Sequence, residues 1–156
     1  MTAYLCGVWI DNYSMSRRAE IVQVSLDGFA YLFDYSAERL IAAWGISEGR
    51  HGAERDASRM KGHPLHDSAH YDRGHAIPHR LGGPTDINLV PQLARINRGA
   101  FRPLEIAAVA TPGALYFTYW IYARGTDSSK GNQTPVGVDQ GLLVPGEKPR
   151  VSRHVN

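Results

Sequence analysis

The sequence predicts an α+β fold in which antiparallel strands build the main sheet. Two runs of alternating apolar residues flank Asp27-Gly28 and indicate a β-hairpin, and residues 115–122 alternate in the same way. Residues 91–107 instead repeat their apolar side chains every three or four positions, which is typical of a helix with one buried face. Because tight turns join antiparallel neighbours, we expect an α+β domain with antiparallel strands.

Length and composition are those of one domain. The chain has 156 residues, of which 43% are hydrophobic, and domains commonly run about 100–200 residues. We therefore expect residues 1–156 to form a single domain, with an irregular loop over 47–70 and a flexible tail over 145–156. The only cysteine, Cys6, excludes an internal disulfide framework. That fits a reducing compartment, or a secreted protein that is stable without bridges.

The N-terminal residues 1–10 are apolar and have no Lys or Arg before them. They lack the basic region of a signal peptide and are interpreted as a buried strand. The most apolar region, 107–123, is interrupted by Pro112-Gly113 and is too short to span a bilayer. We expect no membrane association, and either a cytoplasmic location or delivery by a dedicated secretion system.

Residues 20–35 form the predicted hairpin. Val22, Val24 and Leu26 precede the Asp-Gly turn, and aromatic residues alternate after it. Residues 38–46 fit either a short helix or a strand. Residues 47–70 are rich in Gly, His, Ser and charge and predict an exposed loop.

After a loop at residues 81–84, a helix is expected to begin near Pro91, where the missing N–H costs little. Gly99 and Pro103 are candidate breaks that would divide it into two pieces. Its apolar face would be formed by Leu93, Ile96, Ala100, Leu104 and Ala107.

Residues 115–122 give the clearest strand, and residues 136–144 are expected to return beside it as a hairpin. Its aromatic side chains could stack on bases in a single-strand groove, but we favour a place in the core. These side chains are Tyr116, Tyr119, Trp120 and Tyr122. The polar tail after Pro145 is expected to be loose.

One stretch, residues 72–105, carries the groups that phosphodiester hydrolysis requires. His75 is suited to take a proton from water. Asn97 offers an oxygen that Mg²⁺ accepts, and a Mg²⁺ site needs few protein ligands. Glu105 lies about 80° further round a continuous helix, where it could hold metal-bound waters. Arg73 could grip phosphate with two parallel N–H groups.

Four elements of this stretch together resemble the DNA/RNA non-specific endonucleases, which are ββα-metal or His-Me finger nucleases. The family pattern has a DRGH signature, an N-x-x-P-Q element, an N-x-G with a following aromatic residue, and a glutamate. The matching residues are Asp72-Arg-Gly-His75, Asn88-Leu-Val-Pro-Gln92, Asn97-Arg-Gly99 with Phe101, and Leu104-Glu105.

The resemblance implies a role for each of these positions. His75 would be the general base, Asn97 the direct ligand of Mg²⁺ (with Mn²⁺ as an alternative ion), and Glu105 a ligand through water. Arg73 would contact the substrate phosphate. The remaining positions are Asn88 and Gln92, which would shape the site, and Asp72, which would be mainly structural.

The resemblance also implies a strand–strand–helix metal finger that carries the active site on a central antiparallel sheet. The expected activity is hydrolysis of DNA, with RNA as a second substrate, to products ending in 5′-phosphate. The charge distribution is consistent with a nucleic-acid substrate, because residues 72–156 carry ten Lys/Arg against six Asp/Glu.

The chain departs from the family at one position. Members often carry an arginine one turn after the glutamate, where this chain has Val109. Arg98 or Arg102 could replace it as a phosphate ligand. The chain is also shorter than the secreted members and more similar to the compact nuclease modules of bacterial toxins. That similarity implies a toxin effector and an immunity or inhibitor protein that covers the cleft.

Two other functions remain open on the sequence. A non-catalytic nucleic-acid-binding module would retain the fold and the phosphate grip, although it would have no need of the complete motif. A structural zinc site could form from His63, His66 and His70, with His79 nearby. Pro64 argues against a regular helix there, which favours a solvated loop.

Overall fold

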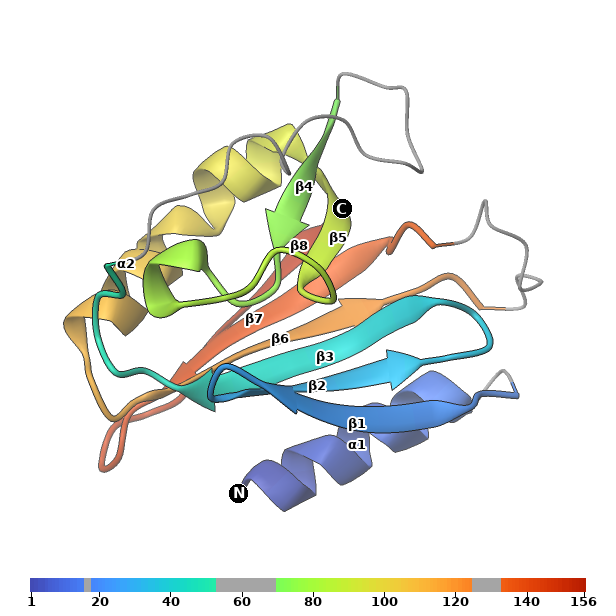
Figure 1. The fold of residues 1–156 in the computed structure, drawn as a ribbon, viewed down its shortest axis with the longest axis horizontal. Helices are drawn as coiled ribbons and strands as arrows, with labels where there is room; N and C mark the ends of the chain where they lie inside the picture. The colour runs from blue at the N-terminus through green and yellow to red at the C-terminus, as the bar shows by residue number, and fades with distance from the viewer. Residues whose placement is uncertain (16–17, 53–69, 125–132) are drawn as a thin grey trace.

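A six-stranded antiparallel sheet, in the order β1-β2-β3-β6-β7-β8, forms the body of the protein (Figure 1). The computed structural model describes residues 1–15, 18–52, 70–124 and 133–156. The sheet confirms the predicted α+β class. Its strands are β1 (Ile21–Leu26), β2 (Phe29–Asp34), β3 (Arg39–Ile46), β6 (Leu115–Ile121), β7 (Gly137–Leu143) and β8 (Arg150–Val155).

A strand–strand–helix unit, here called the finger, lies over one face of this sheet (Figure 1). Strands β4 (Tyr71–His75) and β5 (Leu89–Leu93) pair antiparallel, and the 3₁₀-helix η2 (His79–Leu81) lies in the loop between them. The π-helix η3 (Ile96–Ala100) and the α-helix α2 (Arg102–Ala110) then follow. The finger that the resemblance implied is therefore present.

Helix α1 (Thr2–Ser14) covers the opposite face of the sheet. Alternating side chains of β6 show the two layers, because successive residues of a strand point to opposite faces. Phe117 and Tyr119 contact the ring of Trp9 in α1, at centroid distances of 5.3 and 6.1 Å. Trp120 instead contacts Phe101 at the start of α2. Burial on both faces explains why this strand carries so few polar residues, and the predicted core position of its aromatic side chains is confirmed.

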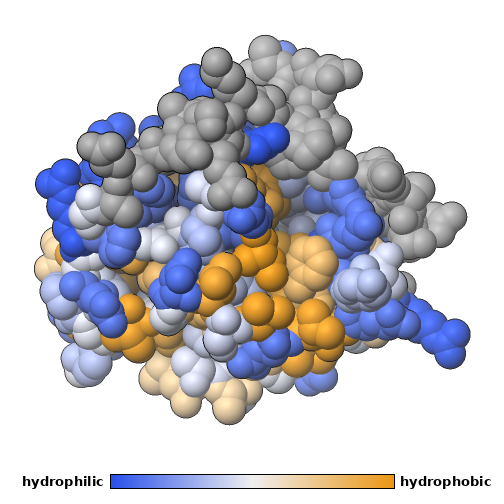
Figure 2. Space-filling model, in the orientation of Figure 1, coloured by the Kyte–Doolittle hydropathy of each residue, from blue (hydrophilic) through white to orange (hydrophobic). Residues whose placement is uncertain are grey.

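The hairpin over residues 20–35 is confirmed, with Leu26 opposite Phe29 across the turn. Asp27 and Gly28 have φ angles of 51° and 80°, the positive values that a two-residue hairpin turn requires. On the edge strand β1 the apolar side chains remain largely exposed, by 43% at Val22 and 40% at Leu26. Apolar surface gathers over this part of the sheet in Figure 2. The ambiguous segment 38–46 is the buried strand β3.

The prediction of a strand over residues 1–10 is wrong, because α1 occupies this segment. Leu5, Trp9 and Tyr13 are four residues apart, and this spacing places them on one face of a helix. Trp9 and Tyr13 are buried, and Leu5 packs against the same core. The Tyr13 hydroxyl also donates a hydrogen bond of 2.7 Å to Asp34 in β2, which ties the helix to the sheet. No helix in the described ranges is long and apolar enough to cross a membrane.

Two further boundaries differ from the prediction. Pro91 lies inside β5 rather than at a helix start, and the helical spacing holds only from Ile96 onward. A proline is tolerated here because, within the described part of the chain, β5 has a strand partner on one side only. The tail is not loose, because β8 pairs with β7 and closes the sheet. Asn156 then bonds the backbone of Leu93 and Pro91, so the C-terminus also secures β5.

We expect Trp9→Ala to lower the free energy of unfolding by about 3–5 kcal/mol, because the change removes a buried indole that contacts three aromatic rings. Urea unfolding followed by circular dichroism measures this. Tyr4→Ala, at a side chain that is 74% exposed on the same helix, is expected to change it by no more than about 0.5 kcal/mol. Equal effects of the two substitutions would show that α1 is not packed on the sheet.

Candidate active site

A cleft of about 470 Å³ lies between the loop that follows β4 and the helices of the finger. It brings together the three side chains that the sequence predicts to do the chemistry: His75, Asn97 and Glu105. They come from the end of β4, the π-helix and α2 respectively. The other residues that line the cleft are Pro78, His79, Arg80, Arg98, Arg102 and Ile106.

His75 is the last residue of β4 and is only 5% exposed. Its ring meets that of His79 edge to face, with 6.2 Å between centroids. The preceding residue, Gly74, must be a glycine for reasons of packing, because a Cβ added there would lie 2.6 Å from the Cβ of Gln92. Gln92, in β5, is fully buried against Gly74 and does not line the cleft.

Asn88 is also fully buried and does not line the cleft. Its side chain accepts a hydrogen bond of 2.6 Å from the N–H of Ile77 and donates to the carbonyls of Ile77 (2.7 Å) and Pro84 (3.0 Å). These bonds join both ends of the loop that follows His75. Gly83 fits against them, because a Cβ there would lie 2.7 Å from the Asn88 amide nitrogen.

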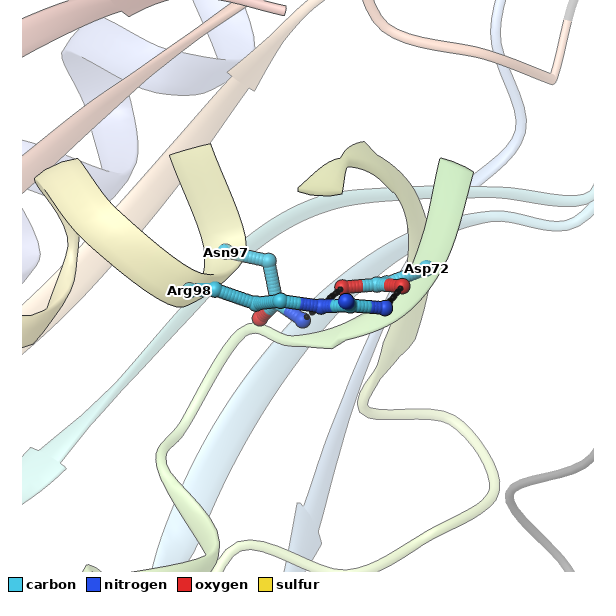
Figure 3. A network of polar contacts seen from close by, with 3 residues as sticks. All are labelled: Asp72, Asn97 and Arg98. Atoms are coloured by element: carbon cyan, nitrogen blue, oxygen red, sulfur yellow. Dashed lines mark hydrogen bonds and ion pairs between the residues drawn. The ribbon is translucent and has the colours of Figure 1, made fainter. Parts of the chain in front are cut away.

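Asn97 and Arg98 both bond the carboxylate of Asp72 (Figure 3). Asp72 Oδ2 accepts from Asn97 Nδ2 at 2.9 Å and from Arg98 Nε at 2.8 Å, while Oδ1 accepts from Arg98 Nη2 at 2.6 Å. The hydrogen bonds from Arg98 lower the pKa of Asp72 below its ordinary value; burial opposes this shift and the Asn97 amide supports it. The carboxylate therefore stays ionised at neutral pH.

Glu105 stands in the first turn of α2, where its N–H donates to the carbonyl of Phe101 at 3.2 Å. Tyr116 of β6 is fully buried nearby. Burial raises the pKa of Tyr116 well above its ordinary value, and the negative charge of Glu105 adds to the shift. The Tyr116 phenol therefore stays neutral near this carboxylate. Gln140 donates a hydrogen bond of 2.9 Å to the phenol oxygen.

Phe101, the aromatic residue of the motif, fixes the junction between η3 and α2. It is fully buried, and its ring lies 6.1 Å from Trp120 and 5.3 Å from His154. Its carbonyl accepts a hydrogen bond of 3.1 Å from Gln140. Sheet residues thus hold the backbone between Asn97 and Glu105.

Arginines line the cleft from two directions. Arg98 and Arg102, the predicted substitutes for the missing family arginine, come from the helices, and Arg80 comes from η2. The sequence analysis missed Arg80, because a basic residue in a loop outside the motif carries no distinguishing signal. Arg73 is half-buried in β4 and does not line this cleft.

The donor set in the cleft fits a hard divalent ion. Asn97 and Glu105 supply a carboxamide oxygen and a carboxylate, and Mg²⁺ combines few such ligands with several waters. Within the described ranges, no group of three or more His, Cys, Asp and Glu side chains could hold a metal. For the zinc alternative, His63 and His66 lie outside the described residues, His70 is exposed, and His79 lines the cleft.

We expect Asn88→Asp to lower the free energy of unfolding by about 2–4 kcal/mol. The substitution leaves two loop carbonyls facing a carboxylate in place of the amide donor, and buried polar groups without partners cost about 1–3 kcal/mol each. Chemical denaturation measures the effect. The same change at exposed Asn12 is expected to cost less than about 1 kcal/mol. A stability equal to that of the wild type would contradict the role of Asn88 in the loop.

Comparison with known proteins identifies the family of the segment that carries this cleft. The family model described as DNA/RNA non-specific endonuclease matches residues 34–112. The matched segment contains the whole finger and, among the residues that the structure describes, all those that line the cleft. No curated protein matches the chain. The match covers half of the chain, and the chain belongs to the DNA/RNA non-specific endonuclease family.

Proposed function

We propose that this protein is a Mg²⁺-dependent endonuclease that cleaves DNA with little sequence preference, and RNA as a second substrate. One observation carries the proposal. A single cleft combines an imidazole, a carboxamide and a carboxylate with the side chains of Arg80, Arg98 and Arg102. A hydrolase of phosphodiesters needs a base, a metal site and cationic groups for the phosphate, and the residues of this cleft offer a candidate for each.

In this mechanism His75 takes the proton from the attacking water. The water oxygen bonds to phosphorus as the bond to the 3′ oxygen breaks, which leaves a 5′-phosphate. The departing 3′ oxygen takes a proton from solvent and becomes a hydroxyl. Asn97 would hold the ion directly and Glu105 through a bound water. When bound, the ion would supply Lewis-acid stabilisation of the phosphate and of the departing oxygen. The cleft arginines orient the phosphate by charge-assisted hydrogen bonds.

Other motif residues act by position. Asn88 fixes the loop after His75, and Gln92 packs against Gly74, the residue before His75. Arg73 stays the proposed phosphate contact that the family resemblance implies. Mn²⁺ is the expected replacement for Mg²⁺, because both ions accept oxygen ligands.

We expect His75→Ala to reduce plasmid cleavage in Mg²⁺ by about 10²- to 10⁴-fold, because it removes the general base. The assay incubates supercoiled plasmid with each protein in MgCl₂ and, separately, in EDTA, which is expected to stop the wild type. His70→Ala, an exposed histidine at the start of the same hairpin, is the matched control and should cleave within a few-fold of the wild type. Near wild-type cleavage by a folded His75→Ala protein would rule out this base.

The same assay separates the proposal from the binding-module alternative. A non-catalytic module would shift the plasmid in a gel without nicking it, in Mg²⁺ and in Mn²⁺ alike. Nicking that persists in EDTA would instead show that the protein is a nuclease and would contradict the metal-dependent mechanism.

An inhibitor protein that covers the cleft is a narrower proposal. A non-specific nuclease degrades the nucleic acid of any cell that holds it, so a producing cell needs protection. We expect induced expression of the wild type in a naive bacterial host to reduce viable counts by at least about 100-fold, while His75→Ala leaves them unchanged. Harmless expression of a wild type that is active in vitro would count against a toxin role and its inhibitor.

A further inference from the structure

Asp72 holds two consecutive helix residues with a single carboxylate (Figure 3). Both residues, Asn97 and Arg98, lie in the π-helix η3. Such turns are rare in proteins and occur frequently at functional sites.

The chemistry of a carboxylate decides which way the Asn97 amide turns. An ionised carboxylate can only accept hydrogen bonds, and a carboxamide has one donating and one accepting end. The donating nitrogen, Nδ2, lies 2.9 Å from Asp72 Oδ2. Rotating the amide by 180° would bring its oxygen against the carboxylate oxygen, with loss of the bond and electrostatic repulsion. The Asn97 oxygen is therefore kept on the side away from Asp72.

Arg98 holds the carboxylate in turn. Two parallel hydrogen bonds, of 2.8 and 2.6 Å, fix the plane of the Asp72 carboxylate. The Arg98 side chain is 73% exposed, whereas that of Asp72 is only 17% exposed. Exposed ion pairs contribute about 0–1 kcal/mol to stability, so gain in stability is a weak reason for this arrangement. Orientation of the Asn97 amide is a stronger one.

We infer that Asp72 is a positioning residue: it locks the Asn97 carboxamide so that its oxygen remains available to hold the divalent ion. The inference rests on the proposed function, because it concerns the residue through which the ion would bind. Asp72 thus has a role in metal binding in addition to the structural role that the family resemblance implies. Groups that orient metal ligands in this way typically change metal affinity by about 10- to 100-fold when they are substituted.

The test is a double-mutant cycle in which MgCl₂ binding is measured by isothermal titration calorimetry without nucleic acid. Asp72→Asn can both donate and accept, so it no longer selects one amide orientation. We expect it to weaken Mg²⁺ binding by about 10- to 100-fold in the wild-type background. In the Asn97→Ala background, where there is no amide to orient, the same substitution should have little further effect. An equal loss in both backgrounds would show that Asp72 acts by its charge alone, and would overturn the inference.

Asp139→Asn is the matched control. Asp139 makes the same two-bond pair with Arg153, at 2.7 and 2.7 Å, and the side-chain exposures are 18% and 71%. It lies on β7 and does not line the cleft. Loss of this pair should leave Mg²⁺ affinity within about 2-fold of the wild type. A loss as large as that of Asp72→Asn would attribute the effect to removal of any surface carboxylate.

A second measurement needs no variant at position 72. In metal-free wild-type protein, ¹⁵N relaxation of the Asn97 side-chain amide should give an order parameter near that of rigid backbone, about 0.85, and a freely turning amide would give less than about 0.6. Asn97→Ala assigns the signal. A mobile amide overturns the inference whatever Asp72→Asn does. Failure of the proposed function would look different: the Asn97 amide would be rigid, but the wild-type protein would not cleave plasmid.

Discussion

The position of the candidate active site depends on the docking of the finger onto the sheet. A two-stranded hairpin such as β4–β5 is marginal on its own, and a nine-residue helix such as α2 is too short to persist alone in water. Phe101 inserts between the two layers and contacts Trp120 and His154 of the sheet. The relative placement of Asn97 and Glu105 is therefore set by strands that carry none of the cleft residues.

Buried polar bonds make this docking specific. Apolar contact alone would let the finger slide on the sheet, because hydrophobic attraction has no direction. Gln140 donates to the carbonyl of Phe101, and Thr118 donates to the carbonyl of Ala76 immediately after His75. Each bond would leave a buried group without a partner if the finger shifted, at a cost of about 1–3 kcal/mol. The loop after His75 and the helices that carry Asn97 and Glu105 are thus held by the same two strands, β6 and β7.

The sequence could predict the elements that carry a local signal. The Asp27-Gly28 turn and the alternation in β6 each follow from backbone geometry, and both are confirmed. Helix α1 was missed because the apolar residues of positions 1–10 fit both the spacing of a strand and that of a helix. Strand β8 was missed because an exposed edge strand buries little and therefore shows no apolar pattern; only its pairing with β7 makes it a strand.

The candidate site, too, could be predicted only in part from the sequence. The motif predicted that His75, Asn97 and Glu105 would meet, and the cleft brings them together. What the motif could not show is which motif residues line the cleft and which lie behind it. Gln92 and Asn88 are polar and would suit a binding site equally well, yet both are fully buried. Their positions depend on how the hairpin closes over Gly74 and Gly83, which is a tertiary property.

The missing family arginine also has an explanation in the packing. Val109 is half-buried and packs against the hydrophobic core, so the end of α2 contributes to the core at this position. The cationic groups come instead from η2, η3 and the start of α2. Arg98 uses Nε and Nη2 on Asp72, and its other nitrogen remains a donor on a largely exposed side chain. It can therefore contact a phosphate without releasing Asp72, which makes orientation of the Asn97 amide compatible with a bound polyanion.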